Sequence, residues 1–219
     1  MWSSEMINMV ILGIGETVYM TLVSTLFGYV LGLPLGIVLA VTDRDGIHPN
    51  RVCYKILDVF TNIVRSIPFL ILLITIQPVT KLIVGRSYGS TATIVPLVAA
   101  AAPFIGRMVE SSIKEVDAGV IEAARSMGAS TFTIIKTVLL GEARTSLIVG
   151  STIAIGTILG YSAMAGIVGG GGLGDIAIRY GYYRYETDVM LVNVVLLVIL
   201  VQIFQSIGML IAARLDKRK

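Results

Sequence analysis

The chain has 219 residues, of which 55% are hydrophobic and only 14% are charged, and its mean hydropathy is +0.87. Soluble domains carry about a quarter charged residues, so this composition excludes an ordinary soluble protein and predicts a membrane protein. The net charge of +3 is weak evidence for a nucleic-acid partner, and the single cysteine, Cys53, excludes an internal disulfide.

Long apolar segments predict the membrane spans, because a spanning helix needs about 20 mostly apolar residues. Five segments have this length: 14–41, 62–84, 91–113, 145–168 and 189–213. Gln77 and Pro78 interrupt the second segment, but membrane helices tolerate such residues better than soluble helices do. We therefore expect an all-α, polytopic membrane protein with five transmembrane helices, in which residues 1–219 form a single transmembrane domain.

The lysine and arginine residues predict the orientation of these spans. Five spans place the two termini on opposite sides of the membrane. If the N-terminus is outside, 13 of the 17 basic residues fall in cytoplasmic segments. Because cytoplasmic loops carry the excess of basic residues, we expect the N-terminus outside and the C-terminus in the cytoplasm. Residues 115–143 then form a cytoplasmic loop.

The sequence lacks the features of a self-powered transporter or an enzyme. We expect no ionisable side chain deep in any of the five spans, where proton-coupled carriers usually hold one. The chain has no G-x-x-x-x-G-K-[ST] phosphate-binding loop. His48 and Cys53 have no metal-ligating residues near them in the sequence, and no nucleophile is paired with a base. We expect no catalytic role, no metal site, and an energy source in another subunit.

Residues 118–140 are amphipathic and predict two short helices between the apolar segments. Gly128 is placed to end the first helix in a left-handed conformation, and Ser130 is placed to cap the second. Such a pair could anchor the loop on the membrane surface or dock into a groove of a partner protein. A DNA-binding helix-turn-helix is disfavoured, because TFTIIKTVLL offers one lysine among mostly apolar residues.

The same region resembles the EAA loop of ABC importer permeases. The stretch EAARSMG, followed nine residues later by VLLG, has the spacing of that motif, although Gly141 replaces its usual proline. In that family the loop is the coupling helix that docks into a groove on the ATP-hydrolysing subunit. The resemblance therefore implies an ATPase-coupling role for Glu122, Ala123, Ala124, Gly128 and Met127.

Three further stretches narrow this resemblance: NIVRSIPFLILL, IVPLVAAAAPFIGRMVE and LGYSAMAGIVGGGGLGDIA are similar to the membrane subunit of methionine ABC importers. The resemblance implies a type I ABC importer permease fold in the bacterial cytoplasmic (inner) membrane. It also implies a homodimer that works with two copies of an ABC ATPase and with an external methionine-binding lipoprotein. ATP and Mg would be bound by the ATPase, and no cofactor by this chain.

The function that this resemblance implies is ATP-driven import of methionine, in the L- form and also the D- form. Two alternatives remain open. The chain could be the permease of a related importer for another amino acid, a dipeptide or an osmoprotectant. More remotely, it could be an ATPase-independent channel or a membrane scaffold whose amphipathic loop is incidental.

The fourth span offers candidate residues for the translocation path. Hydroxyl groups can line a polar route, and a methionine can close it as a soft, flexible plug. The alternative for any single hydroxyl is helix packing. The candidates are Thr157, Tyr161, Ser162 and Met164. At the inner end of the third span, Arg107 and Glu110 are three residues apart and are expected to form a structural ion pair.

The segment RYGYYRYETD, beyond the fourth span, gathers tyrosine and arginine on the expected outer side. These residue types dominate contact hot spots, so we expect the delivering protein to dock here, with an interfacial aromatic belt as the alternative. The candidates are Tyr180, Tyr182, Tyr183 and Arg184. The preceding GGGGLG fits a dinucleotide fingerprint, but it follows a span rather than a strand, and a flexible external turn is expected instead.

Overall fold

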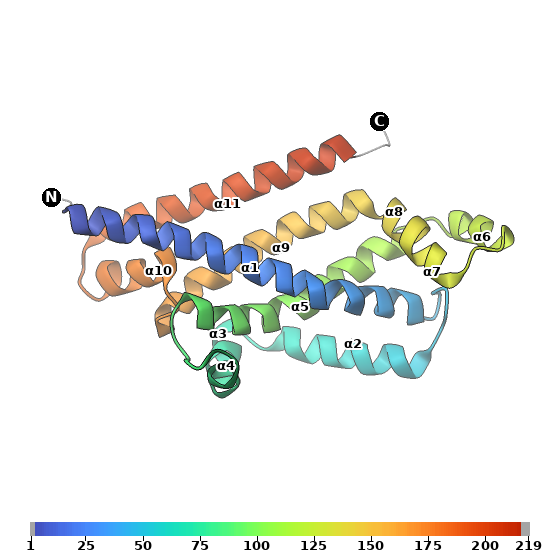
Figure 1. Ribbon diagram of the computed structural model, residues 1–219, viewed down its shortest axis with the longest axis horizontal. Coiled ribbons are helices and arrows are strands. Elements are labelled where there is room, and N and C mark those ends of the chain that lie inside the picture. The colour runs from blue at the N-terminus through green and yellow to red at the C-terminus, as the bar shows by residue number, and fades with distance from the viewer. Residues whose placement is uncertain (1–2, 216–219) are drawn as a thin grey trace.

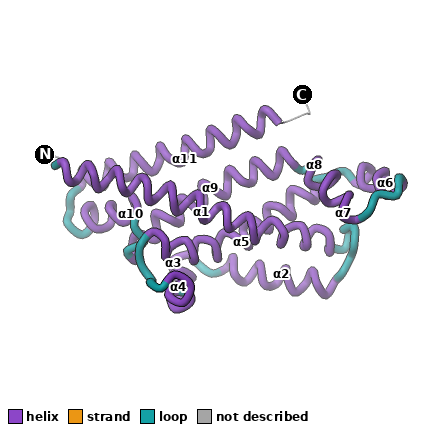
Figure 2. Tube along the Cα trace, in the orientation of Figure 1, coloured by secondary structure: helices purple, strands orange, loops and turns teal. Residues whose placement is uncertain are grey.

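The structure, a computed structural model, describes residues 3–215, and every regular element in that range is a helix. Figure 1 shows an elongated bundle in which the first helix begins at the left and the last helix ends towards the right, and Figure 2 shows the short loops that join the helices. The longest helices are α1 (Ser4–Thr42), α5 (Ser90–Lys114), α9 (Arg144–Ala165) and α11 (Thr187–Leu215).

Within the described residues, four segments are long and apolar enough to cross a membrane: α1, α5, the segment Arg144–Tyr182, and α11. A fifth crossing results if α2 (Arg51–Ser66) and α3 (Phe69–Thr75) are counted as one broken span, since they meet at 100°. The prediction of an all-α polytopic membrane protein is confirmed.

Residues 62–84, which were predicted to form one membrane-spanning helix, do not form a continuous helix, so this prediction is wrong. These residues are divided among the end of α2, all of α3, and α4 (Gln77–Val84). The first break falls at Ile67, whose φ of −78° and ψ of 123° are extended. Pro68 explains the break, because its ring clashes with a helical conformation of the residue before it. As a result, α2 begins eleven residues before the predicted span and carries polar residues alongside α5.

The bundle is centred on the packing of α1 against α5, which is its most extensive helix contact. Glycines at every fourth position of α1 allow the two backbones to approach closely. A Cβ added at Gly32 would lie 2.6 Å from the carbonyl oxygen of Ala102, and one at Gly36 would lie 2.4 Å from that of Gly106. The packing of these helices therefore depends on the absence of side chains at these positions.

The glycine-rich segment after α9 is a packed turn, and the prediction of a flexible turn is wrong. A short 3₁₀ turn, η2 (Gly166–Val168), is followed by α10 (Gly172–Ile176) and a π-helical turn, η3 (Ala177–Tyr182). The Glu16 carboxylate accepts a hydrogen bond from the Gly172 amide at 2.6 Å, and the Thr17 hydroxyl accepts one from the Leu173 amide at 2.9 Å. These bonds fasten the start of α10 to α1.

Candidate functional site

The loop between α5 and α9 contains the candidate coupling residues. It consists of α6 (Ala118–Ser126), α7 (Thr131–Thr133), the π-helical η1 (Ile134–Leu139) and α8 (Leu140–Glu142). Gly128 has a φ of 77°, and the Ser130 hydroxyl accepts a hydrogen bond from the Thr133 amide at 3.2 Å. The predicted helix end at Gly128 and the predicted cap at Ser130 are confirmed.

The candidate coupling residues do not all face the same way. Glu122, Ala123, Met127 and Gly128 are exposed, and Met127 retains 81% of its accessible surface. Ala124 is buried and belongs to the same apolar cluster as Ile134 and Leu139. The side chain of Ala124 therefore holds α6 against η1, and the surface that the loop offers to a partner is built by its exposed neighbours.

Two hydrogen bonds connect this loop to the segment between α1 and α2. The Arg125 guanidinium donates to the carbonyl oxygen of Ile47 at 2.7 Å. His48 Nε2 lies 3.1 Å from the Thr131 hydroxyl. The loop is thus bonded to the connection between α1 and α2, in addition to being continuous with α5 and α9.

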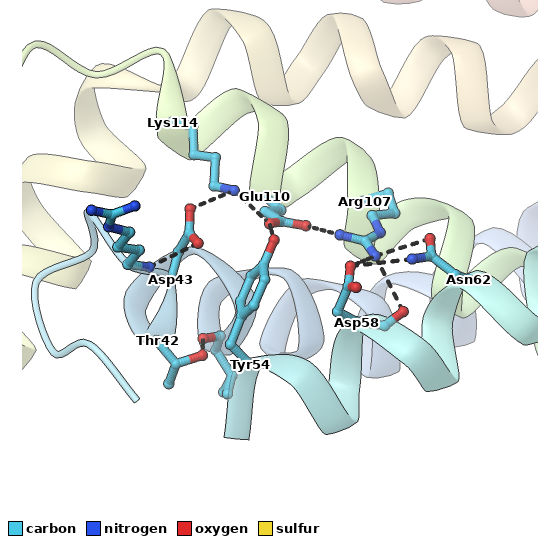
Figure 3. A network of polar contacts seen from close by, with 10 residues as sticks. Thr42, Asp43, Tyr54, Asp58, Asn62, Arg107, Glu110 and Lys114 are labelled. Atoms are coloured by element: carbon cyan, nitrogen blue, oxygen red, sulfur yellow. Dashed lines mark hydrogen bonds and ion pairs between the residues drawn. The ribbon is translucent and has the colours of Figure 1, made fainter. Parts of the chain in front are cut away.

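A network of charged residues ties α1, α2 and α5 together next to this loop (Figure 3). Glu110, which is 4% exposed, accepts hydrogen bonds from Arg107 at 2.7 Å, from Lys114 at 2.8 Å and from the Tyr54 hydroxyl at 3.1 Å. Arg107 also pairs with Asp58 of α2. Sequence periodicity alone found the Arg107–Glu110 pair, and the structure confirms it.

Asp43, which caps the C-terminal end of α1, completes this network. Its carboxylate lies 2.8 Å from the Lys114 ammonium. The hydrogen bond from Lys114, together with one from the Arg44 amide, lowers the pKa of Asp43 despite its partial desolvation. The carboxylate therefore stays charged at neutral pH and contributes a fixed contact between α1 and α5.

The candidate path residues of α9 differ in what they contact. The Tyr161 ring stacks on the ring of Phe69 in α3, with 4.6 Å between the centroids. The Ser162 hydroxyl is buried and donates to the Leu159 carbonyl at 2.7 Å, so it does not face an open surface of this subunit. Thr157 also bonds within its own helix. Met164 is about half exposed and is the path candidate that projects from the subunit.

The candidate docking residues form an exposed aromatic group at the end of η3. Tyr182 and Tyr183 are exposed and lie edge to face, with 5.3 Å between their ring centroids. The Arg184 guanidinium lies 4.4 Å from the centroid of the Tyr180 ring. The sequence analysis missed Tyr185, which is 87% exposed and has a positive φ of 59°.

Arg65, near the start of the predicted span 62–84, lies in the last turn of α2. Because α2 starts at Arg51 and runs antiparallel to α5, its last turn reaches the middle of α5 (Figure 1). There Arg65 lines a cavity of about 270 Å³ together with Phe104 and Arg107 of α5 and Ile153 of α9. A larger cavity, of about 470 Å³, adjoins it between α5, α8, α9 and the end of α11.

Among residues 3–215, no three acidic, histidine or cysteine side chains come together in a way that could hold a metal ion. The structure combines a helical bundle of membrane-spanning length, an amphipathic loop between α5 and α9, and a cavity beside that loop. These features define the class of the protein as a polytopic membrane permease.

The chain belongs to the family described as the binding-protein-dependent transport system inner membrane component, which matches residues 32–219. It is therefore a transport component of a bacterial inner membrane and not an enzyme. A likeness to an amino acid ABC transporter solved with histidines, with a TM-score of 0.80 over 96% of this chain and 95% of that chain at 18% identity, shows that the fold is shared with other ABC importer permeases.

More similar relatives are known in sequence and in structure. The probable D-methionine transport system permease protein MetI of Vibrio cholerae is 50% identical over 203 residues, covering 93% of this chain and 90% of that protein. Its counterpart in Escherichia coli K12 is 48% identical over 164 residues, covering 75% and 76%. A chain of the inward-facing MetNI methionine ABC transporter is 47% identical, with a TM-score of 0.97 over 99% and 100% of the two chains.

Proposed function

We propose that this chain is the permease subunit of an ATP-driven methionine importer, in which two copies enclose the translocation path beside two ABC ATPase subunits. The observation that carries the proposal is the likeness to the MetNI transporter chain, which extends over 99% of the residues at 47% identity. The names of the similar proteins support methionine, and D-methionine in particular, as the substrate. The proposal includes the L- form as well.

The exposed part of the α5–α9 loop is proposed to receive the force of ATP hydrolysis. Glu122, Ala123 and Met127 form its outward surface, and the left-handed Gly128 sets the angle between α6 and α7. The hydrogen bonds of Arg125 and the charge network of Glu110 would pass the displacement on to α1, α2 and α5. In this mechanism the residues transmit motion and perform no chemistry, and ATP and Mg are bound by the ATPase subunits.

The opposite end of the bundle is proposed to face the outside and to receive an external methionine-binding lipoprotein. The exposed aromatic group at Tyr180, Tyr182, Tyr183 and Arg184 is the contact surface in this proposal. Met164 and Tyr161 would close the path near that end, since Met164 is the exposed side chain of the group and Tyr161 is fixed by its stacking on Phe69.

The test is uptake of labelled methionine into proteoliposomes that hold this chain with its ATPase and binding protein, with and without ATP. We expect ATP-dependent accumulation with the natural chain. Gly128→Pro should abolish it, because proline fixes φ near −65° whereas Gly128 has a φ of 77°. The matched control is Gly141→Ala in the same loop, since a Cβ added at Gly141 meets no atom within 4 Å.

The possible results distinguish the methionine importer from the alternative functions. ATP-stimulated activity without methionine accumulation would transfer the proposal to another amino acid, a dipeptide or an osmoprotectant. Methionine movement that is indifferent to ATP and to the ATPase would contradict it and favour a channel. Normal uptake by Gly128→Pro would contradict the assignment of the coupling loop.

A further inference from the structure

Arg65 occupies an unusual position for a charged side chain. It lines the same cavity as Phe104, which is ten residues from the end of α5 at Lys114. At 1.5 Å of rise per residue, this places Arg65 about 15 Å along α5 from its loop end. A charged group within a membrane span is costly unless it faces other protein groups or a water-filled cavity.

Arg65 has no direct partner, in contrast to the charged residues near it. Asp43, Asp58, Arg107, Glu110 and Lys114 are all joined in ion pairs, with three carboxylates for two cations. Arg65 is exposed and forms no ion pair or hydrogen bond with any residue between 3 and 215. The surplus carboxylate offsets the charge of Arg65 at a distance, but the N–H groups of Arg65 have no acceptor within the described residues. A carboxylate that enters the cavity would supply one.

Arg107 lines the same cavity from α5, but its two terminal nitrogens are already paired with Asp58 and Glu110. Its Nε atom is buried and has no hydrogen-bond acceptor within the described part of the chain. Arg65 is therefore the lining side chain whose charged group is exposed and unpaired among the described residues.

The remaining walls suit a small molecule with one apolar end. Phe104, Met108, Val149 and Ile153 are apolar, and Ser146 adds a hydroxyl that is already bonded to Ser112. The volume of about 270 Å³ lies near the lower limit of roughly 300 Å³ for small-molecule sites, so the cavity fits a ligand of the size of a free amino acid.

Glu115 also lines the cavity, but it lies at a different end of the cavity from Arg65. It is eleven residues from Phe104 on α5, which corresponds to about 16 Å along the helix. A small molecule whose carboxylate contacts Arg65 would not reach the Glu115 carboxylate. At the arginine end of the cavity, the carboxylates of Asp58 and Glu110 are paired with Arg107, which leaves Arg65 as the cation that can attract an anionic group.

We propose that Arg65 binds the α-carboxylate of the transported amino acid at an intramembrane subsite, with the apolar side chain of that amino acid against Phe104, Met108 and Ile153. A guanidinium holds a carboxylate with two parallel hydrogen bonds, which gives orientation as well as attraction. The subsite rests on the proposed function, because it names a substrate contact for a transporter of amino acids. It would hold the substrate between its release from the binding protein and its exit to the cytoplasm.

The experiment compares Arg65→Gln, Arg65→Lys and Lys55→Gln in proteoliposomes that hold the complete transporter. Lys55→Gln is the matched control, since Lys55 is an exposed cation of α2 that does not line the cavity. The quantity measured is the number of methionine molecules accumulated per ATP hydrolysed. We expect Arg65→Gln to lower this ratio by about tenfold or more, as the loss of a charge-assisted contact would. Arg65→Lys should retain a larger fraction of the natural ratio than Arg65→Gln does. Lys55→Gln should have the same ratio as the natural chain.

A normal ratio in Arg65→Gln would overturn the proposal, and so would a parallel loss of uptake and ATP hydrolysis, which indicates a structural role. If Arg65→Gln does not assemble, Ile153→Trp decides the question by filling the cavity from α9. We then expect the ratio to fall, while Ile63→Trp, on the exposed apolar face of α2, keeps it. An unchanged ratio in Ile153→Trp would overturn the subsite. Absence of methionine uptake by the natural chain would instead contradict the proposed function.

Discussion

The Arg125 guanidinium donates to the carbonyl oxygen of Ile47 at 2.7 Å, and so joins the helix of the proposed coupling loop to the connection between α1 and α2. The two residues are 78 positions apart in the sequence. Arg125 is inside the EAARSMG stretch but is not among the residues that match the family motif. Its contact joins the loop to the connection between α1 and α2, in addition to the helices α5 and α9 that the loop connects.

The first prediction concerns this contact. Arg125→Ala should lower uptake by roughly threefold or more, because it removes a charged hydrogen bond that a neutral side chain cannot replace. Insertion and assembly should be unchanged, since Arg125 is exposed. The measurement is uptake per ATP hydrolysed, with Lys136→Ala as the control, an exposed cation of the same loop. Equal uptake by the two variants would mean that the contact with Ile47 does not transmit motion.

The second prediction tests the packing of α1 on α5. Gly36→Leu should destabilise the protein, because its Cβ alone would lie 2.4 Å from the Gly106 carbonyl oxygen and 2.6 Å from the Cβ of Val109. Overpacking of this kind typically costs about 1–3 kcal/mol, and here the obstacle is backbone. The thermal midpoint of the purified protein should fall by several degrees. The control is Gly15→Leu, since a Cβ at Gly15 has no atom within 4 Å.

Much of the fold could be predicted from local patterns. Hydrophobic length identified the long helices, and the glycine and serine signals correctly located the end of α6 at Gly128 and the cap at Ser130. The i,i+3 spacing identified the Arg107–Glu110 pair. These features depend on residues close in the sequence, and the physical rules for caps, helix ends and neighbouring side chains act over that range.

The errors arose where distant residues decide the structure. The packing of α2 alongside α5, which places Arg65 in a cavity with Phe104, depends on contacts between distant residues and carried no local signal. The stiffness of the glycine-rich turn comes from Glu16 and Thr17, more than 150 residues earlier. Pro68, directly after Ile67, was the available signal for the broken span. The contacts of Glu16 and Arg125 carried no signal in the sequence.

The third prediction follows from the lowered pKa of Asp43. A carboxyl group whose pKa is lower in the folded than in the unfolded protein stabilises the fold above its unfolded value, which is about 4. That stabilisation is lost as the pH falls through the folded value. The thermal midpoint of the natural chain should therefore exceed that of Asp43→Asn at pH 7. The difference should shrink steadily when the pH falls below about 4. A constant difference between pH 7 and pH 3 would show that the Lys114 contact does not depend on the charge of Asp43.

The fourth prediction concerns the proposed docking of the binding protein on the exposed tyrosines. Tyr182 and Tyr183 project from the end of η3 with about two thirds of their surface exposed, and the next helix, α11, begins only at Thr187. Aromatic side chains in such positions supply large contact areas at a low cost in conformational entropy.

Replacing both, Tyr182→Ser with Tyr183→Ser, should weaken the affinity of the complete transporter for its binding protein by about tenfold or more. The measurement is the dissociation constant of the binding protein from the transporter in lipid nanodiscs. The control is Tyr88→Ser, because Tyr88 is equally exposed but lies outside this aromatic group. If the double variant binds with natural affinity, the tyrosines serve as an interfacial belt in the membrane. In that case the docking surface must be sought on other exposed residues at this end of the bundle.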